Sequence, residues 1–269
     1  MLIAFFVIAV VVLLYVLSTI GSGGHRKLSG LRGWVYAHRG LHGQGIPENS
    51  LAAFRRAKNA GYGIELDIHL LKDGNLAVIH DSQLKRTTGA SGRIEDLTTD
   101  QLKDYYLEGT DQTIPQFQQV LNLFAGNAPL IVELKCVDNN YAELCKTACN
   151  MLDSYKGLYC VESFDPRCIY WLRKNRPDII RGQLTENFFA SKSSKLPWYL
   201  KFVLRHQMLN FLTRPDFVAY RFSDRKDFSY RLCTKFWKTQ SAAWTINTPA
   251  DCEAAQSENS IIIFENFKP

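Results

Sequence analysis

Charged side chains are absent from the first part of this chain of 269 residues, since the run Met1 to Ile20 contains none. A helix of about 20 apolar residues is long enough to cross the hydrocarbon core of a bilayer, which is roughly 30 Å thick. A core helix of a soluble protein seldom stays apolar on every face over that length. The sequence therefore predicts an N-terminal transmembrane helix over residues 1–20.

A basic segment before the apolar run, which is typical of a cleaved secretory signal, is also missing. The stretch Gly21 to Gly24 supplies small residues, so cleavage after the run stays an alternative. Arg26, Lys27 and Arg32 follow the run closely. Because basic residues favour the cytoplasmic side of a membrane, we expect a single-pass membrane protein whose remaining residues lie on the cytoplasmic side.

Paired cysteine motifs are lacking as well. The seven cysteines are an odd number and include no CxxC pair and no zinc-type spacing, which predicts free thiols in a reducing compartment. The net charge of +6 is modest and widely spread. It favours contact with anionic headgroups or an anionic substrate and does not indicate binding to nucleic acid.

The chain after the apolar run consists of a basic Gly/Ser-rich linker, residues 21–33, and a domain over residues 34–269. The domain is close in length to the roughly 250 residues that are typical of a (β/α)8 barrel. Strands are predicted at 34–37, 63–71, 76–80, 130–134, 157–161, 179–184, 217–220, 242–246 and 261–264. Helical patterns lie between most of them, for example at 51–60 after the N-cap Ser50. This alternation predicts an α/β fold, a (β/α)8 TIM barrel with a parallel sheet.

One stretch, residues 82–115, interrupts the alternation of strands and helices. It combines a polar turn region with a capping-box pattern, in which Gln101 follows Thr98 by three residues. We interpret it as a small insertion after the second strand, over the mouth of the barrel.

Ionisable residues gather where several predicted strands end. Such residues are rare in apolar strands because burying an unpaired charge is costly, and the C-terminal ends of barrel strands line the active site. The residues concerned are His38 and Arg39 with Glu48 in the following loop, Glu65 and Asp67, His80 and Asp81, and Glu133 and Lys135.

Three of these residues are carboxylates that suit a metal ion. Glu65 and Asp67 are two positions apart on a strand, so their side chains leave the same face and repel each other unless a cation or a proton lies between them. Glu133 adds a third oxygen ligand of the kind that Mg²⁺ or Ca²⁺ prefers. The sequence therefore predicts a site for one divalent cation.

The remaining residues suit a phosphodiester. Arg39 and Lys135 are donors for phosphate oxygens, and His38 and His80 can exchange protons near neutral pH. A single histidine at a strand end is more often a structural hydrogen-bonding residue, and a lone acidic residue there could be a salt-bridge partner of Arg39. The joint occurrence of these groups at successive strand ends favours a catalytic site, in which Asp81 is a minor candidate for orienting a neighbour.

The order and spacing of these residues resemble those of the glycerophosphodiester phosphodiesterase family. The matching motifs are Ala37-His38-Arg39-Gly40, Pro47-Glu48-Asn49-Ser50, Ala53-Phe54, Gly63-Ile64-Glu65-Leu66-Asp67, His80-Asp81, Val132-Glu133-Leu134-Lys135, Ser163-Phe164-Asp165-Pro166, Pro215-Asp216 and Trp244-Thr245-Ile246-Asn247. The resemblance covers nearly all of the chain after the linker.

This resemblance implies a (β/α)8 barrel and cleavage of glycerophosphodiesters to glycerol 3-phosphate and an alcohol. It implies acid and base roles for His38 and His80, metal ligation by Glu65, Asp67 and Glu133, phosphate contacts for Arg39 and Lys135, support of the site by Glu48, and a glycerol pocket lined by Trp244. The chain departs from the family pattern at Leu71, where many members have Thr, at Ser50, where Thr is commoner, and at Ile262-Ile263-Phe264-Glu265, where relatives tend to read Ile-Ile-Thr-Asp. These departures concern substrate preference.

The stretch 195–214 mixes aromatic and basic residues. It is interpreted either as a barrel helix that packs its apolar face on the sheet or as an amphipathic helix that touches a bilayer. Together with the N-terminal run, it motivates an alternative function, a lysophospholipase D-like activity on lysophospholipids. A third alternative is a non-catalytic barrel attached to a membrane. The sequence does not predict an oligomeric state.

Overall fold

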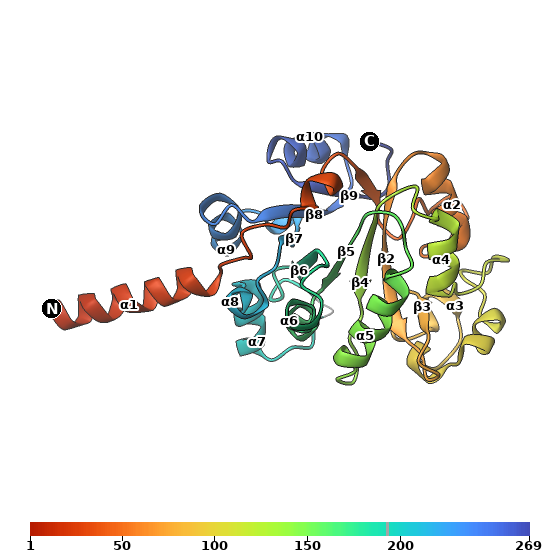
Figure 1. Cartoon of the computed structure of the whole chain (residues 1–269), viewed down its shortest axis with the longest axis horizontal. Helices are drawn as coiled ribbons and strands as arrows, with labels where there is room; N and C mark the ends of the chain where they lie inside the picture. Colours follow the sequence, from red (N-terminus) through yellow and green to blue (C-terminus); the bar gives the residue numbers. More distant parts are fainter. Residues whose placement is uncertain (192–193) are drawn as a thin grey trace.

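Eight parallel strands close into a barrel in the computed structural model, which describes residues 1–191 and 194–269 (Figure 1). The strands of the described residues, all of which except β3 belong to the barrel, are β1 (Val35–Ala37), β2 (Gly63–Leu70), β3 (Leu76–Val78), β4 (Leu130–Leu134), β5 (Tyr159–Ser163), β6 (Arg181–Thr185), β7 (Phe217–Arg221), β8 (Gln240–Ile246) and β9 (Ile261–Phe264). The order is β1-β9-β8-β7-β6-β5-β4-β2-β3, and a parallel pairing of β1 with β2 closes the barrel. The predicted TIM barrel is therefore confirmed.

Helices follow most of the barrel strands and cover the outside of the barrel (Figure 1). The α-helices of the described residues, including α1, which precedes the barrel, are α1 (Leu2–Ser18), α2 (Leu51–Asn59), α3 (Lys85–Thr88), α4 (Phe117–Phe124), α5 (Tyr141–Leu152), α6 (Pro166–Asn175), α7 (Trp198–Arg205), α8 (Asn210–Thr213), α9 (Phe228–Arg231) and α10 (Pro249–Ser257). The start of α2 is fixed as the sequence predicts, because the Ser50 hydroxyl accepts a hydrogen bond from the Ala53 amide at 3.1 Å.

Strand β3 is not a barrel strand, because it pairs antiparallel with the end of β2. The residues after it form α3 and two short 3₁₀ helices, Ile94–Asp96 and Thr99–Asp104. This segment has a small apolar cluster of its own, which includes Leu71, Ile79, Ile94, Leu102 and Ile114. The cluster attaches the segment firmly beside the end of β2.

The interior of the barrel is apolar at the amino ends of the strands. Tyr36, Ile131, Phe217 and Ile263 form part of a buried cluster there, and burial of each such side chain contributes roughly 1.5–3 kcal/mol. The cluster includes Leu28 and Leu31 of a 3₁₀ helix, Leu28–Leu31. Part of the stretch predicted as a linker, residues 21–33, thus packs into the bottom of the barrel, because its two leucines bury apolar surface there.

Helix α1 extends away from the barrel (Figure 1), and none of its side chains is buried. The helix ends at Ser18, where the hydroxyls of Ser18 and Thr19 bond back to the carbonyls of Tyr15 and Val16. No helix among residues 1–191 and 194–269 combines the length and the apolarity that are needed to cross a membrane. The structure therefore does not support the predicted transmembrane helix over residues 1–20, and the cytoplasmic location stays a prediction from charge alone.

The stretch 195–214 forms two short helices, α7 and α8, rather than one amphipathic helix. No side chain of α7 is buried, and Trp198 is 72% exposed. The seven cysteines are all free, and six of them are buried, which agrees with the predicted thiols.

The close contact between β6 and β7 gives a test of the barrel packing. A Cβ atom at Gly182 would lie 2.1 Å from Cζ of the buried Phe217 ring. We expect Gly182→Ala to lower the free energy of unfolding by about 1–3 kcal/mol, because the ring has no room to move away. Urea denaturation measures this change, with Gly33→Ala as the control because nothing lies within 4 Å of a Cβ there. Equal stability of both variants would contradict the described packing.

Candidate active site

Three carboxylates converge at the carboxyl ends of β2 and β4. Asp67 is the register partner of Glu133, and Glu65 leaves the same face of β2 two residues earlier. One oxygen from each carboxylate lies within 4.8 Å of the others. All three side chains are buried. The structure thus brings together the predicted metal ligands, and this set of hard oxygen donors fits a divalent cation.

Burial and mutual repulsion raise the pKa of two of these carboxylates, Glu65 and Glu133. Burial, followed by the charges of Asp67 and Glu133, raises the pKa of Glu65 well above its usual value. Burial likewise raises the pKa of Glu133 to about 7. For Asp67 burial acts in the same direction, but Lys135, His80 and Arg39 hold its pKa well below the usual range.

Lys135 and Arg39 offset the negative charge. The Lys135 ammonium lies 2.9 Å from Asp67 Oδ1 and 2.7 Å from Glu133 Oε1. Burial alone would lower the pKa of Lys135, but these two carboxylates raise it. Arg39 Nε lies 3.6 Å from Asp67 Oδ2, and its Nη1 donates to Glu48 Oε1 at 3.0 Å. Both cations therefore lie beside the acidic cluster.

A sharp turn after β1 positions Arg39. Arg39 and Gly40 both have left-handed backbone conformations, with φ of 53° and 81°. A side chain at Gly40 would meet the backbone of Ala53 at 3.0 Å, so only glycine fits there. The turn directs the Arg39 amide to Glu65 Oε2, to which it donates at 3.1 Å.

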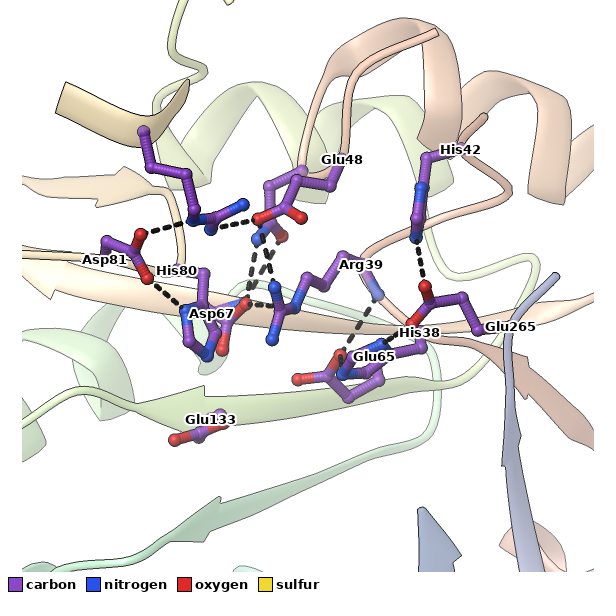
Figure 2. A network of polar contacts seen from close by, with 12 residues as sticks. His38, Arg39, His42, Glu48, Glu65, Asp67, His80, Asp81, Glu133 and Glu265 are labelled. Atoms are coloured by element: carbon purple, nitrogen blue, oxygen red, sulfur yellow. Dashed lines mark hydrogen bonds and ion pairs between the residues drawn. The ribbon is translucent and has the colours of Figure 1, made fainter. Parts of the chain in front are cut away.

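The two predicted catalytic histidines lie on opposite sides of Arg39 in Figure 2. His38 Nδ1 lies 2.6 Å from Glu265 Oε2, and His80 Nδ1 lies 2.6 Å from Asp81 Oδ1. An ionised carboxylate can only accept, so each Nδ1 carries the proton and each Nε2 is left for another partner. Burial lowers the pKa of both imidazoles despite these carboxylates.

Several residues that hold this site together are missing from the sequence prediction. Asn49, noted only as part of a motif, donates to Asp67 Oδ2 at 2.8 Å. Arg86 bridges two site residues, with Nη2 2.6 Å from Glu48 Oε1 and Nε 2.5 Å from Asp81 Oδ2. The only available signal for Arg86 was its place five residues after Asp81.

A fourth carboxylate, Glu162, is the register partner of Glu133 on β5. It is buried, and burial together with the charges of Glu133 and Asp67 raises its pKa well above the usual value. His69 is also buried near the site, where Nδ1 lies 2.7 Å from Glu95 Oε1 and Nε2 lies 3.2 Å from the His80 carbonyl. Through these two contacts, His69 on β2 connects Glu95, in the segment after β3, with the backbone at His80.

A cavity of about 530 Å³ opens beside these groups and is lined by His80, Glu133, Lys135 and Phe164, among others. Trp244, the predicted wall of a glycerol pocket, stacks edge-on against Phe164 with ring centroids 5.7 Å apart. Its Nε1 is buried and has no hydrogen-bond partner among the residues that the structure describes. Arg221 lies over its ring, 5.3 Å from the centroid. The Trp244 ring thus contacts Phe164, which lines the cavity, and the Arg221 guanidinium.

Comparison with known proteins agrees with this geometry. The sequence model of the glycerophosphoryl diester phosphodiesterase family matches residues 38–256. A glycerophosphodiester phosphodiesterase of Bacillus altitudinis is 40% identical over 114 residues, which are 40% of this chain and 46% of that protein. The match therefore spans less than half of that relative.

Two further similarities cover more of the chain. Glycerophosphodiester phosphodiesterase 1 of Mus musculus is 34% identical over 241 residues, 79% of this chain and 71% of that protein. A solved structure of a phosphodiesterase of Oleispira antarctica in complex with sn-glycerol-3-phosphate has a TM-score of 0.70 and 23% identity. The similarity covers 86% of this chain and 92% of the chain in that structure. At that identity the structural likeness supports the fold.

The acidic cluster gives a pH-dependent prediction for metal binding. A cation binds the ionised carboxylates, so the raised pKa of about 7 for Glu133 opposes binding at lower pH. We expect the affinity for Mg²⁺ to rise by roughly tenfold or more between pH 5.5 and pH 8. Isothermal titration calorimetry measures this, with Glu133→Gln as a variant that loses the affinity. Equal affinity at both pH values would contradict the assignment.

Proposed function

Because the chain belongs to the glycerophosphoryl diester phosphodiesterase family, we propose that it hydrolyses glycerophosphodiesters to glycerol 3-phosphate and an alcohol. The observation that carries the proposal is the convergence of three carboxylates, two cations and two histidines at one end of the barrel. Figure 2 shows the carboxylates, the histidines and Arg39. These are the groups that phosphoryl transfer needs, since they offset charge on the phosphoryl oxygens and move protons.

The proposed cofactor is one divalent cation, Mg²⁺ or Ca²⁺, held by Glu65, Asp67 and Glu133. When bound, it supplies positive charge that offsets the charge of the phosphodiester. The three carboxylates suit it because each offers an oxygen within 4.8 Å of the others.

Arg39 and Lys135 are proposed to bind the phosphate oxygens. Arg39 is held in place by Glu48 on one side and approaches Asp67 on the other. Lys135 is half-buried and fixed between Asp67 and Glu133. Both cations are thus oriented before the substrate arrives, which reduces the cost of reorganisation during the reaction.

His38 and His80 are proposed to transfer the protons. One imidazole accepts a proton at Nε2 from the nucleophile as it forms a bond to phosphorus. The other, in its doubly protonated form, donates its Nε2 proton to the alcohol oxygen as the bond from that oxygen to phosphorus breaks. Both water and the glycerol hydroxyl of the substrate, through a cyclic phosphate, are consistent nucleophiles. Incorporation of ¹⁸O or trapping of a cyclic product would distinguish them.

Removal of either histidine should abolish most turnover. We expect His38→Ala and His80→Ala to lower kcat for glycerophosphocholine by about 10²- to 10⁴-fold, because each removes one proton-transfer step. Initial rates with Mg²⁺, Ca²⁺ or Mn²⁺ added measure the loss, and a chelator should remove the activity of the wild-type protein.

His25→Ala is the matched control, because His25 lies before the first barrel strand, where its Nδ1 accepts a hydrogen bond from the Lys27 amide. Near-wild-type rates in both active-site variants would refute the roles of His38 and His80. If the wild-type protein hydrolyses no phosphodiester with any of these metals, the non-catalytic alternative gains support.

A second candidate substrate class is the lysophospholipids. An apolar groove of about 520 Å³ adjoins the cavity beside the acidic cluster and shares Phe164 and Asp165 with it. Its other lining residues include Phe188, Leu196, Leu200 and Leu204. A groove of this chemistry suits a hydrocarbon chain attached to the glycerol.

The groove can be tested by a polar substitution in its wall. We expect Leu200→Asn to lower kcat/KM for lysophosphatidylcholine by roughly tenfold, because apolar contacts with the acyl chain are lost. The rate for glycerophosphocholine should not change. Leu212→Asn is the control, since Leu212 is similarly exposed but does not line the groove. An equal loss for both substrates would contradict an acyl-binding groove.

A further inference from the structure

Glu265 is a carboxylate that no motif of the sequence analysis assigned to the site. It follows β9, where relatives tend to have Asp after Thr. Figure 2 shows it between His38 and His42. One oxygen lies 2.6 Å from His38 Nδ1, and the other lies 3.7 Å from His42 Nε2.

The backbone forces this contact. Ala37 and Phe264 are register partners in the parallel pair β1–β9, so the next residues, His38 and Glu265, follow side by side. The His38 amide donates to the Phe264 carbonyl at 2.9 Å, and the Glu265 amide donates to the Ile246 carbonyl at 2.9 Å. Glu265 is therefore clamped between β1 and β8 at the seam where the barrel closes.

The side chains of His38 and Glu265 both point to the inside of the barrel. Tyr36 and Ile263, two residues earlier on each strand, both belong to the interior cluster. Side chains two apart on a strand share a face, so His38 and Glu265 also point inward. Since the ionised carboxylate only accepts, the Nδ1 atom of His38 must carry the proton. This leaves the Nε2 lone pair on the side of Glu65, whose Oε2 lies 3.9 Å away.

We propose that Glu265 is a positioning residue that holds His38 in the Nδ1–H tautomer and orients its Nε2 toward the reacting phosphoryl group. His42 keeps the carboxylate in place from its other oxygen. In the described part of the chain the Glu265 carboxylate lies within 4 Å of the ring nitrogens of these two histidines, whereas the carboxylate beside His80 is shared with Arg86. The proposal rests on the proposed function, because it concerns the same catalytic histidine.

The tautomer can be observed directly. Nitrogen-15 NMR of the full chain distinguishes Nδ1–H from Nε2–H imidazole, and comparison with His38→Ala assigns the His38 signals. We expect the Nδ1–H form in the wild-type protein. In Glu265→Ala the signals should shift to the Nε2–H form or to a mixture of both.

Activity provides the second measurement. We expect Glu265→Ala to lower kcat for glycerophosphocholine by about 100-fold, because the wrong tautomer blocks one proton-transfer step, with KM unchanged. Glu265→Gln should restore part of the rate, since its amide oxygen can still accept from Nδ1–H. Glu258→Ala is the matched control, a half-buried carboxylate at the end of α10 that contacts Arg225 and Tyr230 instead.

The outcomes separate this inference from the proposed function. Wild-type kcat in Glu265→Ala, or an unchanged His38 tautomer in that variant, would overturn the positioning role while His38→Ala still showed the histidine to be essential. Full turnover in His38→Ala would instead overturn the proposed function. If urea denaturation shows that Glu265→Ala does not fold, kcat and the His38 tautomer are measured in Glu265→Gln instead. A wild-type kcat together with an unchanged tautomer in that variant would refute the positioning role.

Discussion

The repulsion among buried carboxylates at the end of β2 and β4 is the constraint on which this end of the barrel depends. Several kcal/mol are lost when an unpaired charge is buried, and here Glu65, Asp67 and Glu133 share one small volume. Lys135 satisfies two of them, and the Arg39 amide satisfies the third. The cations proposed for phosphate binding are thus also the groups that make the acidic cluster tolerable in the folded chain.

This double role explains why the surrounding loops have unusual backbone conformations. Arg39 and Asn49 both lie in the left-handed region, at φ of 53° and 54°, which costs energy for residues other than glycine. The Asn49 amide also donates to the Arg39 carbonyl at 2.9 Å. Through this bond the two turns support each other, and each directs one donor at an acidic side chain. The strain is therefore coupled to charge balance in the site.

The sequence predicts those parts of the site that lie within single strands. Alternation places Glu65 and Asp67 on one face of β2, and a polar residue at the end of an apolar run identifies Glu133 and Lys135. Residues such as Glu265 were not predictable in this way, because 227 positions separate it from His38. Only closure of the barrel and the β1–β9 register bring the two together.

The elements that differ from the sequence prediction do so for a related reason. By composition Met1 to Ile20 is one apolar run. Composition does not show that the helix ends at Ser18, whose hydroxyl donates a hydrogen bond to the Tyr15 carbonyl. Likewise, Leu28 and Leu31 look in the sequence like scattered residues of a basic linker. Only the fold shows that both pack against the apolar cluster inside the barrel. Strand β3 reads like a barrel strand because its residues are apolar, yet it pairs antiparallel with β2.

The two halves of the barrel mouth differ in chemistry, and this difference bears on substrate choice. The side formed by the ends of β1, β2 and β4 is charged, whereas the side formed by residues after β5 and β6 presents Phe164 and Phe188 to the groove beside α7. Phe164 lines both the catalytic cavity and this groove. A phosphodiester held at the acidic cluster would therefore have one substituent directed over Phe164. The length and polarity of that substituent are what this side can select, because its wall is made largely of the apolar side chains Phe164, Phe188 and Leu200, whereas the charged groups proposed for the phosphoryl chemistry come from the other side.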